Sequence, residues 1–265
     1  MMSPSPQDDD FPWWLVALAA FGLYALWQLL SSDIYWQVFS TLQRGILITV
    51  IVTLVGFAMA SAAGLGLALM SLSRHLILRQ IARLYIEIVR GVPIIVLLLY
   101  VAFVFAPGIV AGYNWLAENT GMDTIRTRDF PLLWRAVIAL AIGYSAFIAE
   151  VFRAGLQSVD PGQIEAANAL GLSRWNRFRH IIFPQAIRTI LPPLGNDFVA
   201  MVKDSSLVSV LGVLDVTQLG KVIAASNFRY FETYNVVALI YLTITVTLSL
   251  LLRRLEKRMR RGHRR

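Results

Sequence analysis

Residues 159–188 read VDPGQIEAANALGLSRWNRFRHIIFPQAIR, a mostly polar stretch that separates two apolar segments of the chain. Asp160 followed by Pro161 is typical of a helix start, and a short helix is expected over residues 164–170. Gly171 is expected to end this helix, because glycine adopts the left-handed backbone of a helix C-terminus without steric cost. The stretch therefore predicts a short polar helix that stops at a glycine.

A second short helix is expected after the glycine. Ser173 can cap this helix, which runs through Arg179, and Pro184 is expected to stop the segment that follows. Two short helices that meet at a glycine form a compact knob projecting from a membrane face. The surface of the knob combines an acidic start with three basic side chains, Arg174, Arg177 and Arg179. Such a mixed surface suits a groove on a soluble partner.

The composition indicates a membrane protein rather than a soluble domain with a large core. Of the 265 residues, 57% are hydrophobic and 15% charged, whereas globular proteins are nearer half apolar and about a quarter charged. The net charge of +8 does not predict a nucleic-acid partner, because the basic clusters directly follow apolar segments, where Lys and Arg fix membrane topology. The absence of cysteine excludes disulfides, thiolate catalysis and cysteine-ligated metals.

The hydrophobic pattern predicts an all-α polytopic membrane protein with about six transmembrane helices. Several apolar runs approach the ~20 residues that a helix needs to cross a bilayer. The predicted spans comprise residues 11–30, 46–70, a third span beginning with 92–105, 131–152, 190–214 and 235–252. The first of these could instead be an interfacial helix. Residues 1–10, MMSPSPQDDD, are expected to be disordered.

The segments between the spans are assigned from their polarity. Residues 74–90 are basic and amphipathic and are expected to form a cytoplasmic connection. Gly91 should break the helix there, and Pro93 suits the first turn of the next span. Residues 107–130 are expected to form an external loop, in which a short surface helix is a further possibility, and residues 216–233 a second external segment.

The distribution of Lys and Arg sets the predicted orientation. Basic residues are concentrated at 74–90, in the stretch 153–188 and in the tail after residue 252, whereas the predicted external segments hold few. Because Lys and Arg accumulate on the cytoplasmic side, six spans with both termini in the cytoplasm are expected. Residues 256–265 then form a basic cytoplasmic tail.

Small residues recur every four positions in the second predicted span, at Gly56, Ala60, Gly64 and Ala68. They share one helix face, and small side chains at this spacing let two helix backbones approach closely within lipid. The pattern predicts a packing face, although glycine and alanine are also common in membrane helices generally.

The spacing within the polar stretch resembles the signature loop of ABC importer permeases: Glu165-Ala166-Ala167, three residues, Gly171, nine residues, Ile181, one residue, Phe183 and Pro184. That loop usually has Leu where this chain has Phe183. Further segments resemble the polar-amino-acid branch of the same family: 41–107 with Gly45, Thr49 and Thr53, 87–93, 148–155, 192–197 and 203–207.

The resemblance covers residues 41–255 and implies the transmembrane domain of a type I ABC importer there. It leaves an extra N-terminal transmembrane helix, over 11–40, outside the usual five-span core. The implied protein is not an enzyme, and it resides in the bacterial inner membrane. The chain contains no Gly-x-x-x-x-Gly-Lys-Ser/Thr phosphate-binding loop. ATP and Mg²⁺ are therefore expected on a partner, and no cofactor is expected in this chain.

The resemblance also implies partners and a coupling mechanism. The expected partners are a dimer of ATPase subunits, a second permease subunit in a homo- or heterodimer, and a periplasmic substrate-binding protein. The polar loop would carry the closure of the ATPase dimer into the transmembrane helices. The residues implied in this coupling are Glu165, Ala166, Ala167, Gly171, Leu172, Ser173 and Arg174.

Polar residues inside the predicted spans are the candidates for substrate binding. An ionisable group in a span costs ~2.5–3.5 kcal/mol on insertion scales, so each needs a partner or an aqueous cavity. Glu150 either pairs with Arg153 three residues away or faces the cavity. Asn196 and Asp197 are expected to face a central cavity, with irregular backbone before them caused by prolines and Gly195. Tyr144 and Ser145 are further candidates.

Positions seven apart share a helix face, which relates Asn196 to Lys203 and Asp197 to Asp204. Lys203 and Asp204 are expected to serve structure or gating. The excess of acidic groups in the spans favours polar or cationic amino acids as cargo, and an opine or a compatible solute is a further possibility. The alternative class is an ion-coupled transporter that uses Glu150 or Asp197 as its proton carrier. The three histidines show no metal-ligand spacing.

Overall fold

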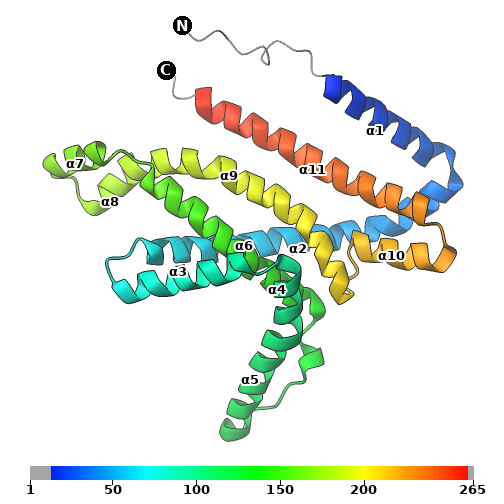
Figure 1. Cartoon of the computed structure of the whole chain (residues 1–265), viewed down its shortest axis with the longest axis horizontal. Helices are drawn as coiled ribbons and strands as arrows, with labels where there is room; N and C mark the ends of the chain where they lie inside the picture. The colour runs from blue at the N-terminus through cyan, green and yellow to red at the C-terminus, as the bar shows by residue number, and fades with distance from the viewer. Residues whose placement is uncertain (1–12, 262–265) are drawn as a thin grey trace.

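The structure, a computed structural model, describes residues 13–261 and places them in helices and short connections, with no strand in this range (Figure 1). The predicted disorder of residues 1–10 and the last four residues of the predicted tail lie outside the described residues. The α-helices are α1 (Trp13–Ser31), α2 (Asp33–Ser71), α3 (Leu76–Gly91), α4 (Ile94–Tyr100), α5 (Ala106–Thr120), α6 (Leu132–Gln157), α7 (Pro161–Ala169), α8 (Arg174–Arg177), α9 (Phe183–Asp204), α10 (Val216–Asn227) and α11 (Tyr230–Arg261). Short π and 3₁₀ turns join some of them: Val101–Phe105, Thr127–Asp129, Phe178–Ile182 and Ser205–Leu211.

Within residues 13–261, four helical segments are long and apolar enough to cross a membrane: Asp33–Ser71, Ile94–Thr120, Leu132–Gln157 and Tyr230–Lys257. A fifth candidate span consists of Arg174–Leu211 and α10, which meet at an angle of 50°. The prediction of an all-α membrane protein is confirmed. The described apolar part of α1, Ala19–Ser31, is shorter than a full span, so the extra transmembrane helix at 11–40 stays a prediction. Residues 33–40 of that predicted helix belong to α2.

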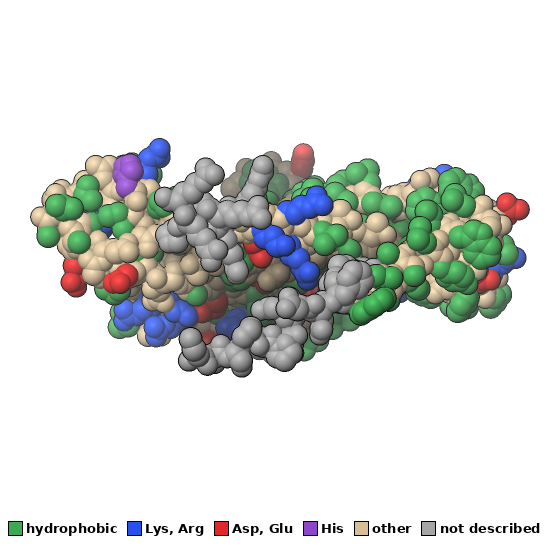
Figure 2. Space-filling view, turned by 90° about the horizontal axis from the view of Figure 1, so that it is seen from above, with side chains coloured by type: hydrophobic (Ala, Val, Ile, Leu, Met, Phe, Trp, Pro, Cys, Tyr) green, Lys and Arg blue, Asp and Glu red, His purple; other side chains and the backbone are tan. Residues whose placement is uncertain are grey.

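The helices are arranged around α2, which runs along the long axis of the molecule in Figure 1. The knob made by α7 and α8 lies at the left end of this view, and the α1–α2 turn and α10 lie at the right end. Figure 2 shows most Lys and Arg side chains on the visible face in the left half and centre, with hydrophobic side chains predominating toward the right. On this face the basic side chains are thus more frequent toward the end that carries the knob, where some acidic side chains also lie.

The most extensive helix contact in the described chain joins α2 to α6. The small residues predicted as a packing face, Gly56, Ala60, Gly64 and Ala68, are all buried. At Gly64 a β-carbon would lie 2.9 Å from Ile148 Cγ2 and 3.0 Å from the Ser145 carbonyl oxygen. The backbones thus approach too closely for any side chain at this position.

We expect Gly64→Val to destabilise the protein much more than Gly66→Val. Overpacking a close helix contact costs about 1–3 kcal/mol, whereas a β-carbon on Gly66 meets nothing within 4 Å. Both substitutions place the same side chain in the same helix, so the intrinsic helix preference cancels between them. The measurement is the melting temperature of the detergent-purified variants. Equal losses at both positions would contradict the close packing of α2 on α6.

The segment predicted as a basic, amphipathic cytoplasmic connection, 74–90, contains the helix α3, which packs against other helices. One face of α3 is buried through Ala82, Ile86 and Val89, and the helix contacts both α2 and α6. The Tyr85 hydroxyl lies 2.8 Å from Ser145 Oγ of α6. The helix does end at Gly91, as predicted, and Pro93 is the N-cap of α4.

Pro107, predicted to begin an external loop, and Pro184, predicted to stop a segment, both lie inside continuous helical segments. Pro107 was predicted to begin an external loop over 107–130, but the helix continues to Thr120, and Pro184 is followed by all of α9. Each proline comes two residues after a π turn, where a backbone N–H donates to the carbonyl five residues back. The wider π turn moves the preceding carbonyls away from the proline ring, which removes the usual clash.

The predicted irregular backbone before Asn196 is also absent, because α9 stays helical through Pro192 and Pro193. The break lies further on, in the 3₁₀ turn Ser205–Leu211 and at Gly212, whose φ of 79° is left-handed. Asp215 then caps α10, its side chain accepting a hydrogen bond from the Gln218 N–H at 2.8 Å.

Candidate functional site

A cavity of about 580 Å³ opens where the α3–α4 junction faces α6 and α9. This volume is within the ~300–1,000 Å³ range of small-molecule sites. The residues that line it are Arg90, Gly91, Val92, Pro93, Ile94, Tyr144, Phe147, Asp197, Ala200 and Asp204.

The local structure of three segments brings these side chains together. Val92 is extended, so the chain changes direction between α3 and α4 and exposes the end of α3 to the cavity. Tyr144 and Phe147 are three residues apart on α6, and Asp197 and Asp204 are seven apart on α9. Both spacings place side chains on one helix face. The predicted shared face of the two aspartates is confirmed.

The cavity contains acidic groups and one basic group. Asp204 Oδ2 accepts a hydrogen bond of 2.8 Å from the Tyr144 hydroxyl. Asp197 Oδ2 is buried, and no hydrogen-bond partner among the described residues satisfies it. Arg90 places its guanidinium over the Phe147 ring, 5.6 Å from the centroid. A buried carboxylate oxygen without a donor is costly, so Asp197 is well suited to receive a donor from a ligand.

The structure brings only some of the predicted binding residues into this cavity. Tyr144 and Asp197 line it, whereas Ser145 is buried against Tyr85 of α3. Glu150 is not among the lining residues; it pairs with Arg153, whose Nε lies 3.1 Å from Glu150 Oε2. Asn196 is exposed and does not line the cavity either.

The two charged lining residues that were missed as binding candidates are Arg90 and Asp204. Asp204 could have been found from its seven-residue spacing to Asp197. For Arg90, the only indication in the sequence was its position next to Gly91, where the helix was predicted to end. Lys203 is exposed, like Asn196 seven residues before it, and the described structure pairs it with no carboxylate.

The knob has the helix–glycine–helix geometry that the sequence predicts. Asp160 caps α7 by accepting a 2.7 Å hydrogen bond from the Gly162 N–H. Gly171 has a φ of 73°, and the Leu172 N–H donates to the Ala167 carbonyl at 3.1 Å. This pattern is a Schellman-type helix end. Ser173 caps α8, accepting from the Asn176 N–H at 3.3 Å.

The knob presents much of its surface to solvent. Ala167 is buried and Leu172 is half-buried, while Glu165, Ala166 and Arg174 are exposed. Leu170 and Trp175 are 81% and 65% exposed. Large apolar side chains with charged neighbours on an exposed knob are typical of a surface that binds another protein.

Residues 60–261 match the protein family described as binding-protein-dependent transport system inner membrane component. The chain belongs to this family. It is therefore a multi-pass permease subunit of the inner membrane rather than an enzyme. Members of the family act in complexes with ATPase subunits, which agrees with the absence of a phosphate-binding loop of the Gly-x-x-x-x-Gly-Lys-Ser/Thr type from this sequence.

Relatives and solved structures of this permease family resemble the chain over most of its length. The chain is 36% identical over 225 residues to the glutamine transport system permease protein of Escherichia coli strain K12, covering 85% of this chain and 95% of the relative. It is 34% identical over 226 residues to the probable amino-acid permease protein of Bacillus subtilis strain 168, covering 85% and 94%. A crystal structure of an amino acid ABC transporter with histidines superposes with a TM-score of 0.70 at 38% identity, covering 87% of this chain and 98% of that one.

Proposed function

We propose that this permease subunit transports amino acids, polar or cationic ones in particular, from a periplasmic binding protein across the inner membrane. The observation that carries the proposal is the cavity lined both by Asp197, whose Oδ2 is buried without a hydrogen-bond partner among the described residues, and by Arg90. A free α-amino acid carries an ammonium and a carboxylate on the same carbon atom, and opposite charges in one cavity suit both groups. The names of the relatives, glutamine and amino-acid permeases, support the same class of cargo.

Each charged group of the cavity has a defined role in this proposal. Asp197 accepts hydrogen bonds from the substrate ammonium, because one of its oxygens has no donor in the described chain. Asp204, held by the Tyr144 hydroxyl, adds negative charge on the same helix face. Arg90 binds the substrate carboxylate, since charge-assisted bonds of guanidinium to carboxylate are strong and directional. Because the cavity has two aspartates and one arginine, it favours substrates with polar or cationic side chains over substrates with acidic ones.

The knob is the proposed contact to the ATPase subunits. Glu165, Ala166 and Arg174 offer exposed side chains, while Gly171 fixes the angle between α7 and α8. The chain continues from α8 through the π turn into α9, which carries Asp197. Movement of the knob on ATP binding would thus reach the cavity through one continuous helical segment.

The knob end is proposed to face the cytoplasm, with both termini on that side. The concentration of Lys and Arg at this end supports the orientation (Figure 2). A second permease subunit, identical or different, is proposed to complete the translocation path, and a dimer of ATPase subunits would hold ATP and Mg²⁺. The periplasmic binding protein would then deliver substrate at the opposite end, where α10 and the α1–α2 turn lie.

The test is uptake into proteoliposomes that contain this chain with its permease and ATPase partners. We expect uptake of radiolabelled polar amino acids only when ATP is inside and the binding protein is outside, with no response to an imposed proton gradient. Uptake driven by the gradient with this chain alone would overturn the proposal in favour of an ion-coupled transporter. Uptake of an opine or a compatible solute in place of amino acids would support ATP as the energy source but refute amino acids as the cargo.

A further inference from the structure

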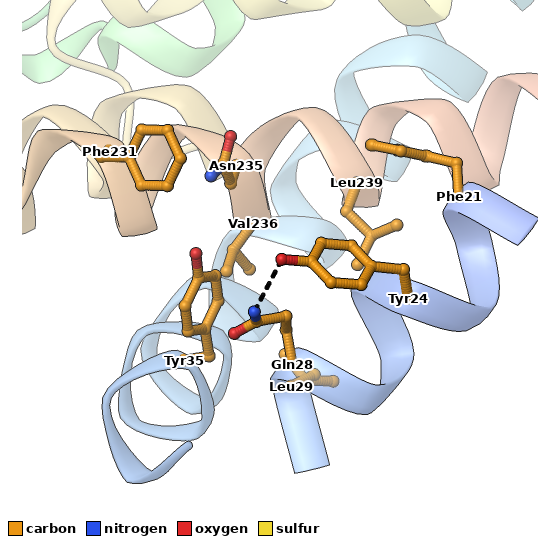
Figure 3. Close-up of a pocket in the computed structure, with 9 residues that line it drawn as sticks. All are labelled: Phe21, Tyr24, Gln28, Leu29, Tyr35, Phe231, Asn235, Val236 and Leu239. Atoms are coloured by element: carbon orange, nitrogen blue, oxygen red, sulfur yellow. Dashed lines mark hydrogen bonds between the residues drawn. The ribbon is translucent and has the colours of Figure 1, made fainter. Parts of the chain in front are cut away.

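A second cavity, of about 220 Å³, lies between α1, the start of α2 and the start of α11. The residues that line it are Phe21, Tyr24, Gln28, Leu29, Tyr35, Phe231, Asn235, Val236 and Leu239 (Figure 3). Its lining residues are distant in sequence from those of the first cavity, the charged cavity that contains Arg90, Asp197 and Asp204. Helix α1 also lies outside the family match at residues 60–261. The second cavity shares no lining residue with the charged cavity.

We propose that this cavity binds one membrane phospholipid of the external leaflet through its glycerol-ester region and the start of an acyl chain. Nothing in the proposal depends on the identity of the transported substrate. The argument rests on the lining chemistry, the depth of the cavity in the membrane and its size.

The lining combines an apolar wall with uncharged hydrogen-bonding groups. Figure 3 shows the hydroxyl of Tyr35 and the amides of Gln28 and Asn235 directed toward the space between the helices. Gln28 Nε2 donates to the Tyr24 hydroxyl at 2.9 Å, which leaves its carbonyl oxygen and a second N–H. The described structure gives Asn235 and Tyr35 no hydrogen-bond partner. No charged side chain lines the cavity, so the matching ligand groups are neutral oxygens such as ester carbonyls.

The position of the cavity along the helices places it at a membrane interface. Gln28 is in the last turn of α1, Tyr35 in the first turn of α2, and Phe231 in the first turn of α11. These helix ends lie opposite the knob in Figure 1. Tyrosine at the headgroup level of a bilayer is typical of membrane proteins, and the ester groups of phospholipids lie at this level.

The surroundings of the cavity favour a lipid as its occupant. Phe231, which lines the cavity, is 74% exposed, and Leu23 and Leu30 of α1 are 69% and 70% exposed, so the cavity lies beside apolar side chains that suit contact with lipid. Its volume of about 220 Å³ admits a slender acyl chain.

The experiment uses the full-length chain with its partners in vesicles of phosphatidylethanolamine and phosphatidylglycerol. A small fraction of phosphatidylethanolamine carries a photoreactive diazirine near the ester end of one acyl chain. After irradiation, labelled residues are mapped by peptide mass spectrometry. We expect labelling concentrated in residues 21–39 and 231–239, several-fold above the exposed apolar faces of α5 and of residues 47–69 in α2.

Two variants test the site by different means. Leu239→Trp fills the cavity, and Asn235→Leu removes an amide at nearly constant volume; each should lower the labelling of these segments about fivefold or more. Leu250→Trp makes the same kind of change on an exposed part of α11 and should leave the labelling unchanged. Labelling spread evenly over all exposed apolar faces, or unchanged in both cavity variants, would refute the proposal. ATP-driven uptake measured in the same vesicles shows whether each variant is folded.

Discussion

Asp197→Asn is expected to lower ATP-driven amino-acid uptake by about 10- to 100-fold while the permease still binds its ATPase. A hydrogen bond to a charged group contributes about 1.5–3 kcal/mol, and each ~1.4 kcal/mol is a factor of ten in affinity. The substitution keeps the size of the side chain, so its effect reports the lost negative charge toward the substrate ammonium. The measurement is initial uptake rate against substrate concentration in proteoliposomes, with co-purification of the ATPase as the second readout.

The neighbouring residue supplies the control for this result. Asn196→Ala changes a polar side chain on the same helix, but that side chain is exposed and outside the cavity, so uptake should stay within about twofold of wild type. Asp204→Asn should have a smaller effect than Asp197→Asn, because Asp204 already receives the Tyr144 hydroxyl. Normal uptake by Asp197→Asn, or an equal loss from Asn196→Ala, would contradict the proposed binding site.

The sequence could identify the helix of the binding site more easily than the side chain that faces it. Consecutive residues of a helix point about 100° apart, and in this helix Asp197 lines the cavity while Asn196 is exposed outside it. Hydropathy marks both as polar groups in a span but does not show which face α6 covers. Likewise, Glu150 forms an ion pair with Arg153 on the same helix. The three-residue spacing was compatible with this pair but did not exclude that Glu150 faces the cavity. Arg90 enters the cavity only because the chain turns after Gly91.

The fold was predictable wherever a local rule operates alone. The left-handed glycine of the knob, the caps at Asp160 and Ser173, and the end of α3 at Gly91 follow from local backbone preferences. The proline predictions were wrong because a π turn changes the hydrogen-bond register just before Pro107 and Pro184, and no composition signal marks such a turn. The inward face of α3 depends on a tertiary contact with α6, which the amphipathic pattern alone does not distinguish from a surface helix.

Glu165→Ala is expected to abolish most coupled uptake without lowering the stability of the permease. Glu165 is exposed on α7, and the described structure gives it neither a hydrogen bond nor an ion pair within the chain. Its loss can therefore act only through a partner. We expect co-purified ATPase to decrease, or its ATP hydrolysis to become independent of substrate and binding protein. Glu118→Ala, at an exposed position of α5, is the matched control and should keep both.

Gly171→Val tests whether the angle between α7 and α8 matters for the same coupling. At a φ of 73° a β-branched side chain is strained, so the valine should force the knob into another shape and reduce uptake tenfold or more. Gly121 has the same φ of 73°, and a β-carbon added at Gly121 or at Gly171 would meet no atom within 4 Å. Gly121→Val thus carries equal backbone strain after α5, in a connection remote from the knob. If both variants lose coupling to the same extent, strain alone explains the loss and the knob is not the contact to the ATPase; loss in Gly171→Val alone assigns that contact to the knob.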